Sequence, residues 1–93
     1  VGACRGELGR LDGVVLNAGV AVQGPAERED LGAFSDVMAV NVTAHAALAA
    51  AAARAMIPAG GGWMIAMSSI LGRRAGTGPG VAAYTASKGA IEQ

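Results

Sequence analysis

The sequence predicts an α/β protein with a doubly wound parallel sheet, of which these 93 residues supply two strands and their flanking helices. Two short apolar runs, at 14–16 and 63–69, are separated by a long stretch of helical pattern. Strands that alternate with helices of this length are typical of right-handed βαβ units, in which helices cover a parallel sheet. Small or polar residues lie at the carboxyl end of each run, which is where such sheets bind their ligands.

Both apolar runs are predicted to be strands buried on both faces, because neither alternates between apolar and polar residues. The first run lies between Asp12-Gly13 and the segment Asn17-Ala18-Gly19, and the second ends in Ser68-Ser69. The carboxyl ends of parallel strands meet at one edge of a sheet. We therefore expect the segment 17–19 and the two serines to lie side by side.

The stretch from Asp30 to Ile57 is the predicted long helix. Asp30 can cap its N-terminus, apolar residues then recur at spacings of three and four, and alanine dominates the second half. Pro58 and the glycines 60–62 are expected to end it.

The remaining segments are two loops and the start of another helix. The stretch 20–30 contains Gly24-Pro25 and several charges, and 70–81 contains four glycines and a proline, so both are predicted loops. The last stretch, 82–93, begins a further helix.

Composition excludes several classes of function. Seven acidic and seven basic residues give a formal net charge of zero, so nothing favours nucleic acid or an anionic membrane as a partner. The longest apolar stretch, 46–57, is too short and too rich in alanine for a membrane span.

The single Cys4 fits a reducing cytoplasm, and the lone His45, without a Cys/His cluster, excludes a structural zinc site. We expect His45 on the helix surface or in a subunit contact.

The segment "YTASK" contains the only tyrosine and the only lysine, Tyr84 and Lys88. Four residues of helix rise by about 6 Å and return to the same face, so the two side chains are neighbours. A nearby cation favours the ionised phenolate, which would let Tyr84 act as a general acid and base. A serine hydroxyl at the strand end, Ser68 or Ser69, could polarise a carbonyl oxygen at the same time. The alternative is an ordinary amphipathic pair on a solvated helix face.

Four motifs in this order and at about this spacing resemble those of short-chain dehydrogenases/reductases. They are "LNAG" (16–19), "NVTA" (41–44), "MSSILG" (67–72) and "YTASK" (84–88). The resemblance covers essentially the whole chain. It implies a Rossmann fold, a nicotinamide cofactor (NAD or NADP) and hydride transfer between a secondary alcohol and a ketone.

The resemblance also implies a role for each catalytic candidate. Tyr84 is the implied acid–base, and Lys88 stabilises its phenolate and hydrogen-bonds the nicotinamide ribose. Ser69 matches the donor to the substrate oxygen, whereas Ser68 would help to close the strand end. Asn41 matches the helix asparagine that orders a water in the proton relay to the lysine.

The implied cofactor-binding residues are Asn17, Ala18, Gly19, Tyr84 and Lys88. The first three match the strand-end segment that passes along the adenosine side of the cofactor. The resemblance further implies that residues 1–93 are the central part of a single NAD(P)-binding domain. The Gly-rich phosphate-binding turn, the strand that selects NAD or NADP and the later substrate region are not in this sequence.

Two departures from the family pattern affect the site. Leu16 stands where the family commonly has a first asparagine, and the stretch from Ser69 to Tyr84 is slightly longer than usual, with the extra residues in 73–80. The second change bears on the placement of the substrate pocket.

We predict an enzyme that acts on a small alcohol or carbonyl compound and forms a homodimer or homotetramer, without nucleic acid or membrane partners. One alternative is a non-catalytic nucleotide-binding or scaffolding relative. The other is an inactive partial gene product, since the isolated segment lacks part of the fold.

Overall fold

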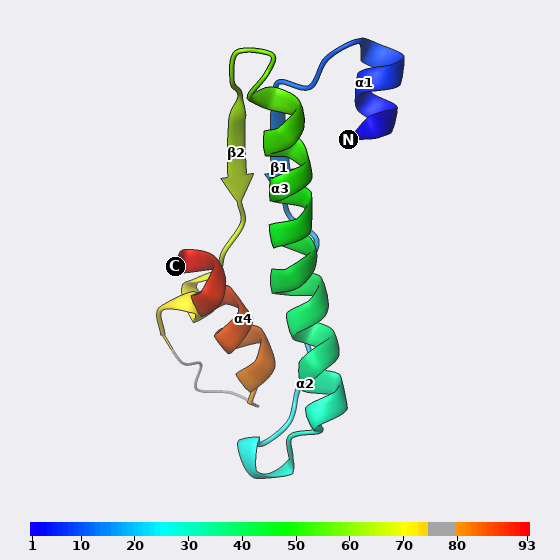
Figure 1. Cartoon of the computed structure of the whole chain (residues 1–93). Helices are drawn as coiled ribbons and strands as arrows, with labels where there is room; N and C mark the ends of the chain where they lie inside the picture. Colours follow the sequence, from blue (N-terminus) through cyan, green and yellow to red (C-terminus); the bar gives the residue numbers. More distant parts are fainter. Residues whose placement is uncertain (75–79) are drawn as a thin grey trace.

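The structure, a computed structural model, describes residues 1–74 and 80–93, and its centre is a βαβ unit (Figure 1). Strands β1 (Gly13–Leu16) and β2 (Trp63–Ala66) pair in parallel, with Leu16 opposite Ala66 at their carboxyl ends. The helical connection between them comprises α2 (Leu31–Met38), η2 (Ala39–Thr43) and α3 (Ala44–Met56). The predicted fold class is confirmed, with two strands of a parallel sheet and flanking helices.

The helical connection is continuous, as the sequence predicts, and begins at its predicted cap. The Asp30 carboxylate accepts hydrogen bonds from the amides of Gly32, at 2.8 Å, and Ala33, at 3.3 Å. Within it, η2 is a π-helical turn, which the sequence pattern does not indicate. The buried residues lie four or seven positions apart and so share one face. They are Val37, Asn41, His45, Ala52 and Met56.

The end of α3 is formed by glycines, also as predicted. The Gly61 amide donates to the Met56 carbonyl oxygen at 2.8 Å, and Gly60 and Gly61 have φ values of 104° and 114°. These angles lie in the left-handed region, where a side chain would be strained. The turn leads directly into β2.

The length of the helix bears on the membrane question. Leu31–Met56 is 26 residues long and contains an 18-residue stretch with a mean hydropathy of 1.3, so by length and composition alone it could cross a membrane. The prediction that no stretch is long enough for a membrane span considered only 46–57, which is part of this longer helix. The core helices of water-soluble proteins meet the same criterion, so one such helix is weak evidence for a span. In this chain α3 lies against β1.

The prediction that both strands are buried on both faces is wrong for this chain. Every residue of β2 is exposed, and in β1 only Leu16 is buried while Val15 is 48% exposed. The helical connection lies along one side of the strand pair (Figure 1). A strand needs cover on both sides to be buried on both faces, and the described residues supply only one layer.

Two further helices and two short turns complete the described residues. Helix α1 (Gly2–Leu8), unassigned by sequence pattern, ends at Gly9, whose φ is 82°. The loop 20–30 contains a short turn, η1 (Ala26–Arg28). A second turn, η3 (Ile70–Gly72), follows β2 and packs against α4 (Ala82–Glu92), the predicted last helix. The predicted loop 70–81 lies partly outside the described residues.

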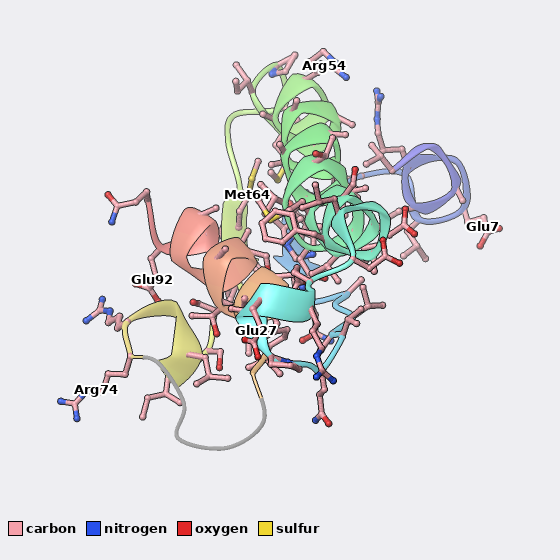
Figure 2. The ribbon with its side chains drawn as sticks, turned by 90° about the horizontal axis from the view of Figure 1, so that it is seen from below. Glu7, Glu27, Arg54, Met64, Arg74 and Glu92 are labelled. Carbon is pink, nitrogen blue, oxygen red and sulfur yellow. The ribbon has the colours of Figure 1, made fainter. Side chains whose placement is uncertain are left out.

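Several charged side chains lie on the outside of the molecule. Figure 2 shows this for Glu7, Arg54 and Arg74, which lie on three different segments, and Glu27 is exposed as well. All four residues are exposed. Among the described residues, the buried polar side chains bind one another or the segments that follow the two strands, and they are Asn41, His45, Ser87 and Lys88.

Candidate active site

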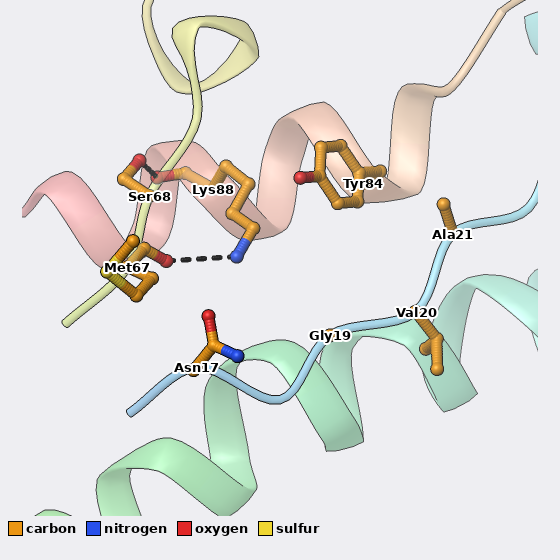
Figure 3. A pocket seen from close by; sticks show the side chains of 8 residues that line it. All are labelled: Asn17, Gly19, Val20, Ala21, Met67, Ser68, Tyr84 and Lys88. Carbon is orange, nitrogen blue, oxygen red and sulfur yellow. Dashed lines mark hydrogen bonds between the residues drawn. The ribbon is translucent and has the colours of Figure 1, made fainter. Parts of the chain in front are cut away.

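An open pocket of about 300 Å³ lies at the carboxyl ends of β1 and β2, beside α4 (Figure 3). Three segments line it: the loop after β1, the end of β2 and the first half of α4. The lining residues are Asn17, Gly19, Val20, Ala21, Met67, Ser68, Tyr84 and Lys88. Because Asn17 and Ser68 both line it, the predicted juxtaposition of the two strand ends is confirmed.

Lys88 reaches into this pocket from α4 and does not lie on a solvated helix face. The residue is only 3% exposed, and its Nζ donates a hydrogen bond to the Met67 carbonyl oxygen at 2.9 Å. The interpretation of Tyr84 and Lys88 as a solvated surface pair is therefore wrong. An ammonium group has three protons, so two remain for other acceptors at the pocket.

Tyr84 lies beside this ammonium group. The Lys88 Nζ is 5.5 Å from the centroid of the Tyr84 ring, a distance at which the cation and the ring attract each other. Tyr84 itself is half-buried, and Figure 3 shows its hydroxyl end turned toward Lys88. Among residues 1–74 and 80–93, no hydrogen-bond partner satisfies this hydroxyl, so it is available to a ligand in the pocket.

The two serines after β2 use their hydroxyl groups differently. Ser68 lines the pocket and donates to the Lys88 carbonyl oxygen at 3.2 Å. Ser69 does not line this pocket; its Oγ accepts a hydrogen bond from the Leu71 amide at 3.2 Å and so begins η3. Accepting this bond does not use the hydroxyl proton of Ser69, which has no acceptor among residues 1–74 and 80–93, whereas Ser68 has committed its only proton.

Asn41 is fully buried on the π-helical turn and binds the loop after β1. Its Oδ1 accepts from the Val20 amide and its Nδ2 donates to the Val20 carbonyl oxygen, both at 2.8 Å. Nδ2 also donates to the Ser87 hydroxyl at 3.0 Å. The side chain therefore joins the pocket wall to α4. It does not line the pocket itself.

Ser87 was not singled out by the sequence analysis, although it lies inside "YTASK". It is fully buried, accepts from Asn41 and donates to the Tyr84 carbonyl oxygen at 2.7 Å. Its spacing of three from Tyr84 on a helix was the available signal, because residues at that spacing share a face. Ser87 thus connects the helical turn at Asn41 with the backbone that carries Tyr84.

His45 is also buried, and the expectation of a surface or subunit position is wrong. It is 4% exposed, and its Nε2 lies 2.7 Å from the Ala18 carbonyl oxygen. His45 follows Asn41 by one helical turn, and both side chains point to the same loop. Neither charge nor periodicity indicates this contact, since it depends on where the loop lies.

The predicted cofactor segment, Asn17, Ala18 and Gly19, is exposed along the rim of the pocket. A Cβ at Gly19 would stand 3.8 Å from the Lys88 Nζ and 3.6 Å from the Asn41 Oδ1. The loop therefore passes close to Lys88, and the missing side chain leaves that side of the pocket open. Asn17 and Gly19 line the pocket, whereas Ala18 turns its carbonyl oxygen to His45.

Residues 1–93 match the profile of the short chain dehydrogenase family over their whole length, so the chain belongs to this family. It is 36% identical over 92 residues to gluconate 5-dehydrogenase of Gluconobacter oxydans. The alignment covers 99% of this chain and 35% of that protein.

Solved structures of family members share the fold. A short-chain type dehydrogenase/reductase from Mycobacterium marinum superposes with a TM-score of 0.93 at 35% identity, over 97% of this chain and 37% of that one. A gluconate 5-dehydrogenase from Burkholderia cenocepacia, in complex with NADP and tartrate, gives 0.87 at 31% identity, over 97% and 34%. This chain thus spans about a third of the length of these relatives.

Proposed function

We propose that this chain is the catalytic segment of an NAD(P)-dependent oxidoreductase that interconverts a secondary alcohol and a ketone. The observation that carries the proposal is the Tyr84–Lys88 pair in an open pocket at the strand ends. A buried ammonium group beside a phenol that has no hydrogen-bond partner among the described residues is an arrangement for moving a proton. Membership of the short chain dehydrogenase family supports the same chemistry.

In the proposed reaction, Tyr84 takes the hydroxyl proton from an alcohol or returns it to a ketone oxygen. Lys88 stabilises the phenolate by its charge, because an opposite charge nearby favours the ionised form. Ser69, which adjoins the lining residue Ser68, donates to the same substrate oxygen the proton for which the described residues offer no acceptor. When bound, the nicotinamide cofactor accepts or supplies the hydride.

The residues at the pocket fit such a cofactor. Lys88 keeps two protons for the hydroxyl groups of a ribose, and Gly19 leaves space beside its Nζ. The Burkholderia relative was crystallised with NADP. We propose NAD or NADP for this chain, held along Asn17, Ala18 and Gly19, with Asn41 fixing the loop that carries them.

We further propose that residues 1–93 are the central part of one nucleotide-binding domain. The relatives are about three times as long, and the exposed strands here would receive further strands and helices in such a domain. The experiments below therefore use the complete protein that contains this segment.

The decisive experiment is Tyr84→Phe, which removes one oxygen and keeps the ring. Turnover is expected to fall by about 10²–10⁴-fold, the usual loss when general acid–base catalysis is removed, with cofactor affinity nearly unchanged. Thr85→Val is the matched control, since it also removes one hydroxyl from α4 at a residue that does not line the pocket. Wild-type turnover in Tyr84→Phe would refute the proposed chemistry.

The complete protein is also proposed to be a homodimer or homotetramer. Helix α3 exposes mainly small side chains, including Ala44, Ala46, Ala47 and Ala50, and small side chains allow helices to approach closely. Light scattering at micromolar concentration tests this, and a uniform monomer would contradict it.

A further inference from the structure

We propose that His45 is a positioning residue that holds the cofactor-facing loop through the Ala18 carbonyl oxygen. The inference rests on the proposed function, and neither the four motifs nor the family resemblance assigns this residue a role. The juxtaposition that carries it is a buried imidazole 2.7 Å from a backbone oxygen of the pocket loop.

The chemistry of this contact fixes the position of the imidazole proton. A carbonyl oxygen only accepts hydrogen bonds, so the Nε2 of His45 must carry the proton that it donates. The other nitrogen, Nδ1, is buried and has no hydrogen-bond partner among residues 1–74 and 80–93. The contact with Ala18 is thus the one hydrogen bond that the described residues give this side chain, and His45 is suited to a fixed role as a single donor.

Two adjacent turns of the same helix hold this loop. Asn41 binds both backbone groups of Val20, and His45, four residues later, binds the carbonyl group of Ala18. Gly19, which faces the Lys88 Nζ, is the residue between the two anchored positions. Because the anchors lie on either side of it, the path of Gly19 across the pocket depends on both.

His45 differs from Tyr84 and Lys88, because it does not line the pocket. It can affect a bound cofactor only by placing the loop. Removing its hydrogen bond should therefore weaken cofactor binding and leave the proton-transfer groups in place.

The test compares His45→Leu with His45→Gln in the complete protein. Leucine fills similar space without a donor, and we expect the KM for the cofactor to rise by about three- to tenfold with kcat within about twofold. Glutamine retains an N–H donor and is expected to recover most of the affinity. Met56→Ala is the control for general destabilisation, because Met56 is equally buried on α3 but lies far along the helix from the loop.

An unchanged cofactor KM in His45→Leu would overturn the proposal, and so would a glutamine variant as weak as the leucine variant. An equal rise in Met56→Ala would show that packing, and not the hydrogen bond, is responsible.

Hydrogen exchange of the Gly19 and Val20 amides gives a readout without cofactor. It should be faster in His45→Leu than in wild type, and equal rates would also overturn the proposal. If wild type neither binds a nicotinamide cofactor nor turns over an alcohol, the proposed function fails, while the exchange measurement still decides the role of His45.

Discussion

Ser68 and Ser69 are neighbours in the chain, yet only one of them has a proton to offer. Ser68 donates to the Lys88 carbonyl oxygen, whereas Ser69 accepts from the Leu71 amide. A hydroxyl group has one proton and two acceptor positions, so these two bonds leave the residues with different capacities. At the residue scale, this difference favours the proposal that Ser69, which adjoins the lining residue Ser68, is the donor to a substrate oxygen.

Alanine substitutions separate the two serines. Ser69→Ala is expected to lower kcat by about 10²–10³-fold, the usual effect of removing a donor to a developing oxyanion. Ser68→Ala removes a neutral bond to a backbone oxygen and is expected to lower kcat by less than about tenfold. Steady-state kinetics of both variants in the complete protein provide the measurement. A larger loss in Ser68→Ala would transfer the role to Ser68.

Lys88 has two proposed roles, one toward Tyr84 and one toward the ribose of the cofactor, so its loss should have two effects. Lys88→Met keeps much of the buried stem but removes the charge beside Tyr84 and the donors that face the pocket. We expect kcat to fall and the cofactor KM to rise, each by about 10- to 100-fold, because bonds to charged groups contribute about 1.5–3 kcal/mol. Tyr84→Phe, by contrast, should affect kcat alone. A Lys88→Met variant with an unchanged cofactor KM would contradict the ribose contact.

At the scale of elements, the position of Ser69 depends on the packing of η3 against α4. Gly72 permits close contact, since a Cβ there would come within 2.9 Å of the Lys88 carbonyl oxygen. Beyond it, the Arg73 Nε and Nη2 both donate to the Glu92 Oε2, at 3.1 and 3.0 Å. The turn after Ser69 is thus joined to the helix that carries Tyr84.

The contribution of Glu92 and its partners to the stability of the fold should depend on pH. The Ser68 hydroxyl, whose one proton is then shared between the carboxylate and the Lys88 carbonyl oxygen, and next the Arg73 guanidinium lower the pKa of Glu92 below its ordinary value of 4.5. A carboxyl group whose pKa is lower in the folded state stabilises the fold above its unfolded pKa, and the stabilisation is lost as pH falls. The difference in Tm between wild type and Glu92→Gln should therefore be present at neutral pH and shrink as pH falls below about 4.5.

Two arginine variants complete that experiment. Arg73→Gln should reproduce part of the effect of Glu92→Gln, because it breaks the ion pair but leaves the Ser68 hydroxyl that also lowers the pKa of Glu92. Arg74→Gln is the matched control, as Arg74 is exposed and makes no ion pair within the described part of the chain. The exposed pair is small in energy, so the sign of the pH dependence is the result that matters. A Tm difference that grows toward acid pH would contradict the assignment.

Periodicity predicted the elements better than it predicted their contacts. The parallel strand pair, the Asp30 cap and the glycine end of the long helix depend on local pattern, and all were predicted. The π-helical turn and the burial of His45 depend on where a loop 20 or more residues away comes to lie, which no local pattern contains. The motif "YTASK" indicated Tyr84 and Lys88, but the buried position of Ser87 required the structure.

At the scale of the whole molecule, the chain is extended. Its radius of gyration is 15.7 Å and its extents are 49 × 23 × 17 Å, whereas a compact globule of 93 residues would have a radius of about 12 Å. Large apolar side chains of both strands are exposed, among them Trp63 at 54% and Ile65 at 49%. The buried apolar residues are few, and two of them are alanines, namely Ala52 and Ala83.

These properties predict that residues 1–93, expressed alone, do not fold cooperatively. Ordering the backbone costs about 1–2 kcal/mol per residue, and alanine offsets little of this because it buries little apolar area. A pair of strands with open edges and exposed apolar faces also tends to associate with other chains. We expect a chain that is molten or aggregated and binds no dinucleotide.

Thermal unfolding of the isolated chain, followed by circular dichroism and by the fluorescence of Trp63, tests this expectation, with the complete protein as the control. A sharp transition in the isolated chain, coincident by both probes, would show that the two strands and their helices are sufficient for a stable fold.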